Sequence, residues 1–436
     1  MGTIVEATAP LMSAGLDSIA TTAFVSTLAN RLSADLAPTA LFDHPTLESI
    51  ASFVSNEVAS DDSKMQALVM DLTWQKALTT RSSAVVSAWS LSLPGCASSR
   101  SAVRDLTTLA LAANTRVPAA RWVSPPSGID TAAATYGSFA SEDQLGLDRA
   151  AFGISAAEAR SMDPQQSLVL SVGYGALCGD DRVEASTDAS ARRDALATSG
   201  VGVFVGVEAS GLVGGTDQAS VFAASGGALS VASGRLSYCL GLVGPCYSID
   251  TACASALAAL HVCVLALRIG GECDDGLAVG TKVLSEAANA ATAVGGMTSA
   301  SGRCHTFDLR ADGYCRGEGC GAFLVRRGSN CEVAILGSAV RQDGPSASLT
   351  APNGSSQQRL IEAVRADAFG AAAGCASLEA HGTGTALGDP IEVLQETGKE
   401  VASAFRHSVR IGGRRVSRSG KRASAVHVSQ VEPGPP

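Results

Sequence analysis

The sequence has few charged residues and no excess of basic ones. Charged side chains make up 17% of its 436 residues, and the formal net charge is −9 at pH 7. A protein that binds nucleic acid over its whole surface needs a positive field, so this class is excluded. Hydrophobic residues make up 46%, which excludes a disordered or fibrous chain and suffices for a large core.

Metal-binding cysteine patterns and membrane signals are missing as well. The twelve cysteines include no Cys-x-x-Cys pair, and the closest spacing, Cys315 to Cys320, lacks a second pair or a histidine cluster of zinc type. We therefore expect reduced, buried thiols and no metal. Met1–Pro10 has no basic stretch followed by an apolar one. The longest apolar run, Ala252–Leu267, is too short to span a bilayer and contains His261, so it predicts a buried helix. We therefore expect no membrane partner. The expected location is the cytoplasm, with the plastid left open.

The charge is unevenly distributed along the chain. Residues 406–436 hold seven Lys and Arg against one acid, Glu432, which gives +6 and leaves −15 for the rest. We expect a disordered basic tail over 402–436, whose abrupt change of composition suggests a shifted reading frame. The only aromatic residue beside the basic cluster is Phe405, so the tail offers no platform for stacking bases, and we expect no nucleic-acid partner.

The chain before the tail divides into a helical and an α/β part. Over 1–58 we expect two helices, the second opened by Pro45 and Thr46, with an apolar stripe at Leu47, Ile50, Ala51 and Val54. Residues 59–82 are polar and predict a linker. From Ala84 onward, short β-rich runs alternate with Ala-rich helical stretches, which indicates a layered α/β fold. The clearest β-rich runs are 202–207, 246–249 and 332–336.

Ser18 is the first candidate for chemistry. It follows an acidic residue at the start of a helix, where a serine usually caps the helix. However, the run Pro10–Ser18, with Leu41–Leu47 further on, resembles the acyl carrier proteins of polyketide and fatty-acid synthases. The resemblance implies that Ser18 carries 4′-phosphopantetheine, and the amide groups of a helix N-terminus suit its phosphodiester. Only a short segment precedes the motif, so a partial carrier domain is expected.

Cys253 is the second candidate. Residues 244–261 predict a strand, a sharp turn and an apolar helix, which places the Cys253 thiol at a helix N-terminus. Such a position favours the nucleophilic thiolate. The pattern D-T-A-C-A-S followed by A-L-A-A-L-H over Asp250–His261 resembles the nucleophile motif of the β-ketoacyl synthases, and the resemblance implies that role for Cys253.

His381 is the third candidate. It lies in the glycine-rich run Leu378–Glu392, where Gly382 and Gly384 let the backbone pass close to a neighbour. In the ketosynthase family a histidine in this motif is one of two that hydrogen-bond the carbonyl of a malonyl thioester, so the resemblance implies this role for His381. We expect structural roles for the other histidines, which are His44, His261, His305, His407 and His427.

The resemblance extends over 83–401 and is strongest to type I modular polyketide synthases. Further matching runs are expected to be scaffold, and they are Met162–Gln166, Thr306–Gly321, Gly337–Gly344 and Thr350–Gly354. The implied fold is α/β, a thiolase-like layered αβαβα ketosynthase, C-terminally truncated and preceded by a partial α-helical carrier. The family's K-x-N-x-G-H motif and late G-F-G loop are not found, so the second catalytic histidine is missing and Glu392 is expected to lack its lysine partner.

The resemblance implies chain elongation by decarboxylative Claisen condensation of a malonyl-type extender onto an acyl chain held on Cys253. The expected partners are acyl- and malonyl-carrier thioesters, other polyketide synthase modules and a second copy of the chain. Two alternatives stay open at this point. One is acyl capture on Cys253 without elongation, and the other is an inactive fragment that only dimerises through the strand near Cys246–Ile249.

Overall fold

The computed structural model describes residues 27–28, 46–52, 84–108, 112–122, 132–179, 189–212, 220–270, 272–328, 333–344, 352–368 and 379–396. The chain divides into two compact units, Met1–Arg81 and Ser82–Pro436. Each unit is described by itself. Ser18, the predicted linker 59–82 and the predicted tail 402–436 lie outside the described residues.

The described part of the first unit includes the start of the predicted second helix. Residues 47–52 are helical, and Thr46 and Ser49 cap the first turn reciprocally. The Ser49 amide donates to Thr46 Oγ1 and the Thr46 amide donates to Ser49 Oγ, both at 3.1 Å. This arrangement satisfies amide groups that have no partner within the helix. Ile50 is buried as expected, whereas Ala51 is exposed, so the apolar stripe is narrower than predicted.

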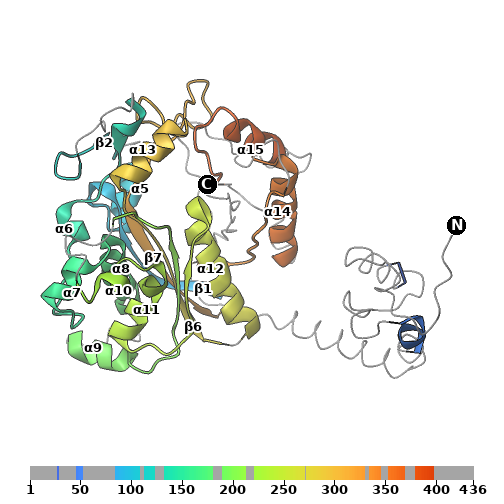
Figure 1. The fold of residues 1–436 in the computed structure, drawn as a ribbon, viewed down its shortest axis with the longest axis horizontal. Coiled ribbons are helices and arrows are strands. Elements are labelled where there is room, and N and C mark those ends of the chain that lie inside the picture. Colours follow the sequence, from blue (N-terminus) through green and yellow to red (C-terminus); the bar gives the residue numbers. More distant parts are fainter. Residues whose placement is uncertain are drawn as a thin grey trace. The chain divides into compact units, whose positions relative to one another are not determined.

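A six-stranded mixed sheet forms the centre of the second unit (Figure 1). Its strands in chain order are β1 (Ala84–Ser92), β4 (Gly202–Val207), β5 (Cys246–Ile249), β6 (Asp275–Lys282), β7 (Gly319–Arg327) and β8 (Val333–Ile335). The spatial order is β5-β4-β6-β7-β1-β8. The β5-β4 and β4-β6 pairs are parallel, and the other three pairs are antiparallel. A separate ribbon pairs β2 (Thr115–Arg116) with β3 (Tyr136–Gly137).

Successive residues of the central strands point into two different cores. On β4, Val203 and Val205 pack on one face and Phe204 packs on the other. Leu277 and Ala278 of β6 are divided between the two cores in the same way. Both faces are therefore buried, which explains why these strands are continuous apolar runs instead of alternating ones.

Helices cover both faces of this sheet, as Figure 1 shows. The helices α8 (Pro164–Cys178) and α11 (Leu229–Leu240) contribute to one core, and α12 (Ser255–Leu265) contributes to the other. Further α-helices in the described part of this unit are α5 (Arg100–Thr108), α6 (Glu142–Leu145), α7 (Ala156–Ser161), α9 (Ala189–Leu196), α10 (Ala223–Gly226), α13 (Glu286–Val294), α14 (Gly354–Asp367) and α15 (Gly388–Glu396). Short turns of other helix types are η1 (Pro94–Cys96), η2 (Ala132–Ala134), η3 (Ala252–Ala254) and η4 (Ala266–Gly270).

The predicted strands and the predicted buried helix are confirmed. The runs at 202–207 and 246–249 form β4 and β5, and the run at 332–336 contains β8. The apolar run Ala252–Leu267 forms η3, α12 and the start of η4. Within the described ranges, no helix combines the length and the apolar character needed to cross a bilayer.

Candidate active site

Cys253 lies at a sharp turn between β5 and α12, as predicted, and it is exposed. The residue before it, Ala252, has φ 51°, in the left-handed region that a residue with a side chain rarely adopts. Hydrogen bonds hold this backbone in place. Asp250 Oδ1 accepts from the Ala252 amide at 3.0 Å, and Ser255 Oγ accepts from the Thr251 amide at 2.8 Å and donates to the Ala252 carbonyl at 2.7 Å. The turn therefore presents Cys253 to solvent in a fixed position at the start of α12.

Glycines on two strands let the start of α12 rest directly on the sheet. A Cβ at Gly206 of β4 would lie 2.3 Å from the Ser255 carbonyl oxygen, and a Cβ at Gly280 of β6 would lie 2.5 Å from Ala256 Cβ. Both approaches are too short for any side chain. The turn with Cys253 is thus seated near the carboxyl ends of the parallel strands, where α/β proteins commonly place reactive groups.

His381 is exposed in a loop that α15 holds by its acidic side chains. The two carboxylate oxygens of Glu392 accept from the amides of His381 at 3.0 Å and Gly382 at 2.9 Å. Asp389 Oδ1 accepts from the Gly384 amide at 2.9 Å. Glu392 is therefore not an uncompensated acid, because two backbone amides donate to the carboxylate that was expected to lack its lysine partner.

The glycines of this loop pack against the segment that precedes β7. Gly382 and Gly384 have φ values of 57° and 72°, which glycine adopts without strain. Thr306 Oγ1 donates to the Gly382 carbonyl at 2.6 Å, and the Gly313 amide donates to the Gly384 carbonyl at 3.0 Å. These glycines were expected to let the backbone pass close to a neighbour, and the neighbour is the backbone segment that contains Thr306 and Gly313.

The helix α14 is joined to the α12 side of the sheet. His261 Nδ1 on α12 lies 2.9 Å from Ser338 Oγ, and Arg268 of η4 pairs with Asp367 of α14 at 3.1 Å. Burial lowers the pKa of His261 below its ordinary value. These contacts place His261 between the α12 side of the sheet and the segment around Ser338.

The run Met162–Gln166 joins elements of the scaffold. Asp163 caps α8 by accepting from the Gln165 amide at 2.8 Å, and it also accepts from Ser210 Oγ at 2.6 Å. Gln165 Oε1 in turn accepts from the Val283 amide at 3.0 Å. The segments after β4 and β6 are therefore both joined to the start of α8.

Glu318, in the expected scaffold run Thr306–Gly321, is a second joining point. Its side chain is fully buried and forms an ion pair with Arg121. It also accepts from the amides of Ala140 and Leu284, both at 2.9 Å. A buried carboxylate is stable in the fold only with such partners, so this one fixes three chain segments to the start of β7.

The other cysteines are not all buried. Cys263 and Cys320 are buried in the core, and burial raises the pKa of Cys320 to about 12. Cys246 and Cys304 are exposed, so the expectation of buried thiols is wrong for them. Cys246 lies on β5 at the end of the sheet, and Cys304 lies in a loop that lines a cavity.

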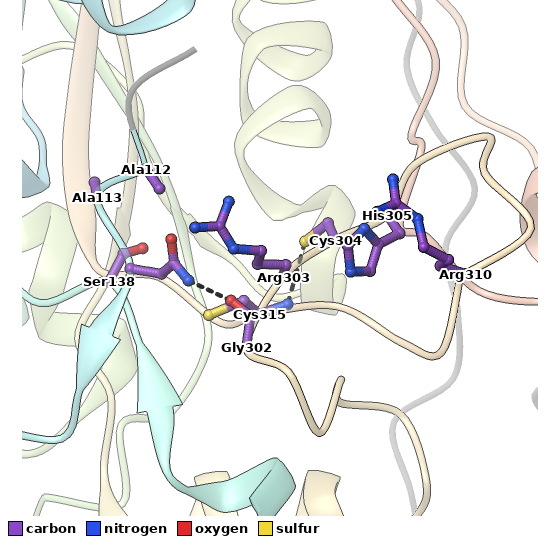
Figure 2. Close-up of a pocket in the computed structure, with 10 residues that line it drawn as sticks. Ala112, Ala113, Ser138, Gly302, Arg303, Cys304, His305, Arg310 and Cys315 are labelled. Carbon is purple, nitrogen blue, oxygen red and sulfur yellow. Dashed lines mark hydrogen bonds between the residues drawn. The ribbon is translucent and has the colours of Figure 1, made fainter.

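That cavity was missed by the sequence analysis. It has a volume of about 610 Å³, and neither Cys253 nor His381 lines it (Figure 2). Its lining residues are Ala112, Ala113, Asn114, Ser138, Gly302, Arg303, Cys304, His305, Arg310 and Cys315. The available sequence signal was the close spacing of Arg303, His305 and Arg310, of which only Arg310 lies within the run Thr306–Gly321 that was interpreted as scaffold.

Three family models match the chain. The β-ketoacyl synthase N-terminal domain matches residues 82–330, which is more than half of the chain. The chain belongs to the β-ketoacyl synthase family. The model of the family's C-terminal domain matches residues 333–413, and that of the phosphopantetheine attachment site matches residues 2–54. These matches confirm the predicted family and the predicted cofactor, although Ser18 itself lies outside the described residues.

Curated relatives of this ketosynthase are large polyketide synthases. Mycoketide-CoA synthase of Mycobacterium tuberculosis is 36% identical over 405 residues, which cover 87% of this chain and 9% of the relative. The pikromycin polyketide synthase component PikAIII of Streptomyces venezuelae is 44% identical over 257 residues, which cover 55% of this chain and 16% of the relative. The chain thus spans only a small part of the relatives that it matches.

Solved ketosynthases have the same fold. The ketosynthase from module 6 of the bacillaene synthase of Bacillus subtilis 168 aligns with a TM-score of 0.62 and 28% identity, over 74% of this chain and 54% of that one. The oxazolomycin ketosynthase domain OzmH KS7 of Streptomyces albus aligns with a TM-score of 0.64 and 29% identity, over 76% and 58%. The predicted thiolase-like α/β class is therefore confirmed.

Proposed function

We propose that this chain elongates a polyketide by decarboxylative Claisen condensation, as a 3-oxoacyl-[acyl-carrier-protein] synthase. The observation that carries the proposal is the exposed Cys253 on its hydrogen-bonded turn at the start of α12. A helix N-terminus stabilises negative charge, so it favours the thiolate needed for attack on a thioester. Among the cysteines that the structure describes, the other exposed ones lie on β5 and in the loop beside the cavity, and neither begins a helix.

The proposed reaction has two stages. The Cys253 thiolate attacks the carbonyl of an acyl-carrier thioester, the carrier thiol leaves, and the acyl chain becomes bound to Cys253. A malonyl-type extender then loses CO2, and the resulting carbanion attacks the acyl carbonyl. The Cys253 thiolate leaves, and the product is a β-ketoacyl thioester two carbons longer.

His381 is proposed to hydrogen-bond the thioester carbonyl of the extender and to stabilise the negative charge that develops there. This proposed role is supported by the position of His381 in its loop. The Glu392 carboxylate holds the backbone of His381 and Gly382, while the imidazole side is exposed. The loop is thus fixed from the backbone side and leaves the side chain accessible to a substrate.

Ser18 is proposed to carry the phosphopantetheine. That group supplies a thiol on a long flexible arm, which holds the acyl chain as a thioester. Attachment to the same chain raises the effective concentration of the acyl donor or acceptor. Other carrier domains and modules of a polyketide synthase are the proposed partners, in the cytoplasm, where cysteines stay reduced.

A second copy of the chain is also a proposed partner. The strand β5 is the end strand of the sheet order, and Tyr238, Val243 and Tyr247 near it are 88%, 68% and 46% exposed. An end strand beside exposed apolar side chains is suited to pairing with another copy.

The test separates the two stages. The full-length protein is incubated with a short acyl thioester and examined by intact mass and peptide mapping, which should show one acyl group on Cys253. Cys253→Ala should abolish this adduct, whereas Cys304→Ser, which removes another exposed cysteine, should leave it unchanged. Addition of malonyl-carrier should then release the acyl group as a β-ketoacyl product.

The role of His381 is tested in the same assay. His381→Ala should slow condensation about 100- to 1,000-fold, the usual effect of removing one charge-stabilising donor, and change acylation by less than about threefold. Acylation without any condensation product would replace elongation with acyl capture. Failure of Cys253 to react above the other cysteines would favour the inactive dimerising fragment.

A further inference from the structure

Two cysteines meet in the cavity of Figure 2. Cys304 and Cys315 both line it, and the Cys315 amide donates to Cys304 Sγ at 3.2 Å. Covalent geometry keeps a cysteine sulfur within about 3 to 4 Å of its own backbone nitrogen. The backbone of Cys315 therefore lies against the Cys304 sulfur, whereas the Cys315 sulfur points away from it in Figure 2. A rotation about the Cα–Cβ bond of Cys315 would bring the two sulfur atoms together.

The two thiols differ in their exposure to solvent. Cys304 is exposed, whereas Cys315 is partly buried. Burial raises the pKa of Cys315 to about 11, and the nearby Cys304 raises it further as it ionises. An oxidant dissolved in water therefore reaches Cys304 first, and Cys315 is positioned to react second.

We propose that Cys304 and Cys315 form a reversible disulfide when the protein meets a peroxide. Hydrogen peroxide oxidises the Cys304 thiolate to a sulfenic acid and releases hydroxide, which takes up a proton to give water. The Cys315 sulfur then attacks the Cys304 sulfur, the S–S bond forms, and a second water leaves. The two thiols together lose two electrons and two protons, and a dithiol reductant reverses the change.

The disulfide would act on the loop that contains His381. A Cβ at Gly384 would lie 2.9 Å from the His305 nitrogen and 3.2 Å from Cys304 Cα, so the backbone of Cys304 is packed against this loop. The Thr306 and Gly313 hydrogen bonds to the loop both arise from the segment between the two cysteines. Movement of Cys304 toward Cys315 loosens these contacts. This step depends only on the packing of the loop and holds whether or not the chain condenses acyl groups.

Tryptic peptide mapping detects the disulfide directly. Cleavage after Arg303, Arg310 and Arg316 puts the two cysteines on separate peptides, 304–310 and 311–316. The full-length protein is treated with hydrogen peroxide, blocked with N-ethylmaleimide and digested without reductant. The two peptides should appear joined, and they should separate after dithiothreitol.

Variants decide whether the pair is specific. Cys315→Ser should abolish the joined peptides, and Cys246→Ser, which removes an exposed cysteine on β5, should leave them at the wild-type yield. A Cys304 that proceeds to sulfinic acid in the wild type, or that joins a different cysteine, overturns the proposal.

Hydrogen exchange tests the effect on the loop. After peroxide treatment, amides in 379–389 of the wild type should exchange at least threefold faster, and the Cys304→Ser variant should show no change. A disulfide that forms while the exchange of this segment stays constant overturns the coupling to the His381 loop.

Discussion

At the scale of residues, position separates one cysteine from the others. Cys263 and Cys253 are both in or beside the same apolar helix, yet the first is buried in the core and the second is exposed at the turn. The difference arises from the Ala252 backbone, which takes a left-handed conformation held by Asp250 and Ser255. Strain maintained by surrounding hydrogen bonds is typical of functional sites.

His261 predicts a pH dependence of stability. Burial lowers its pKa in the folded protein below the ordinary value of 6.5. As the pH falls through about 6.5, the unfolded chain therefore binds the proton first. The contribution of the neutral His261 is complete above that pH and is lost as the pH falls toward the folded pKa.

The measurement is the free energy of unfolding in urea between about pH 7.5 and 5, the range in which histidine titrates. His261→Gln should flatten the decline on the acid side of this range, because the variant has no group to protonate there. An unchanged decline in the variant would assign the effect to other groups. Arg268, Arg341 and Asp367 also act on this site, and the aspartate opposes the fall in the pKa.

The role of single residues was predictable only where a motif carried it. The turn around Cys253 follows from a short local pattern, and the structure has it. The contact of Gly384 with Cys304 joins residues far apart in sequence, and no periodicity reveals such a pair. The Glu392 amide bonds were missed for a related reason, because a backbone partner leaves no trace in residue identity.

At the scale of elements, the placement of α12 depends on glycine at positions 206 and 280, where any side chain would collide with the helix. Gly206→Ala would place a Cβ 2.3 Å from the Ser255 carbonyl oxygen, and backbone cannot move aside as a flexible side chain can. We expect a loss of about 1 to 3 kcal/mol in the free energy of unfolding, the usual cost of overpacking. Acylation of Cys253 should fall as well, because Ser255 braces its turn.

Gly200→Ala is the matched control, since nothing lies within 4 Å of a Cβ there. Its free energy of unfolding should stay within about 0.5 kcal/mol of the wild type. Urea unfolding and the acylation assay give both readouts. Equal effects of the two substitutions would show that the close contact of α12 with β4 does not govern the site.

The elements themselves were predictable to different degrees. The strands β4 and β5 are compact runs rich in β-forming residues, so they were found from local pattern alone. The pairing of β1 with β7 and β8 joins segments more than two hundred residues apart, and it brings the first strand of the unit between two of the last. The alternation of β-rich and helical runs indicated a layered α/β fold, but local patterns carry no information on the order of the strands within the sheet.

At the scale of the whole molecule, the proposed interface with a second copy is the side of β5, which is the end strand of the described sheet. Tyr238 of α11 and Tyr247 of β5 are exposed on this side, and Tyr247 is held by stacking on Phe204 with ring centres 5.7 Å apart. The helix α11 is itself joined to β5 through Ser233 and Ser248. The surface is therefore built by two elements fixed to each other, which gives a partner a rigid face to bind.

Tyr238→Asp should convert a dimer into a monomer. The side chain is 88% exposed in the isolated chain, so the substitution leaves the fold intact, whereas a buried unpaired carboxylate in an interface is strongly unfavourable. We expect the dimer dissociation constant, measured by sedimentation velocity, to rise at least about tenfold, which corresponds to about 1.4 kcal/mol.

Leu309→Asp places the same charge at another fully exposed apolar residue and should leave the dimer unchanged. A monomeric wild-type protein, or equal weakening by both substitutions, would exclude the β5 side as the interface. A dimer lost only with Tyr238→Asp would place the two β5 strands, and with them the two Cys253 turns that directly follow, at the centre of the assembly.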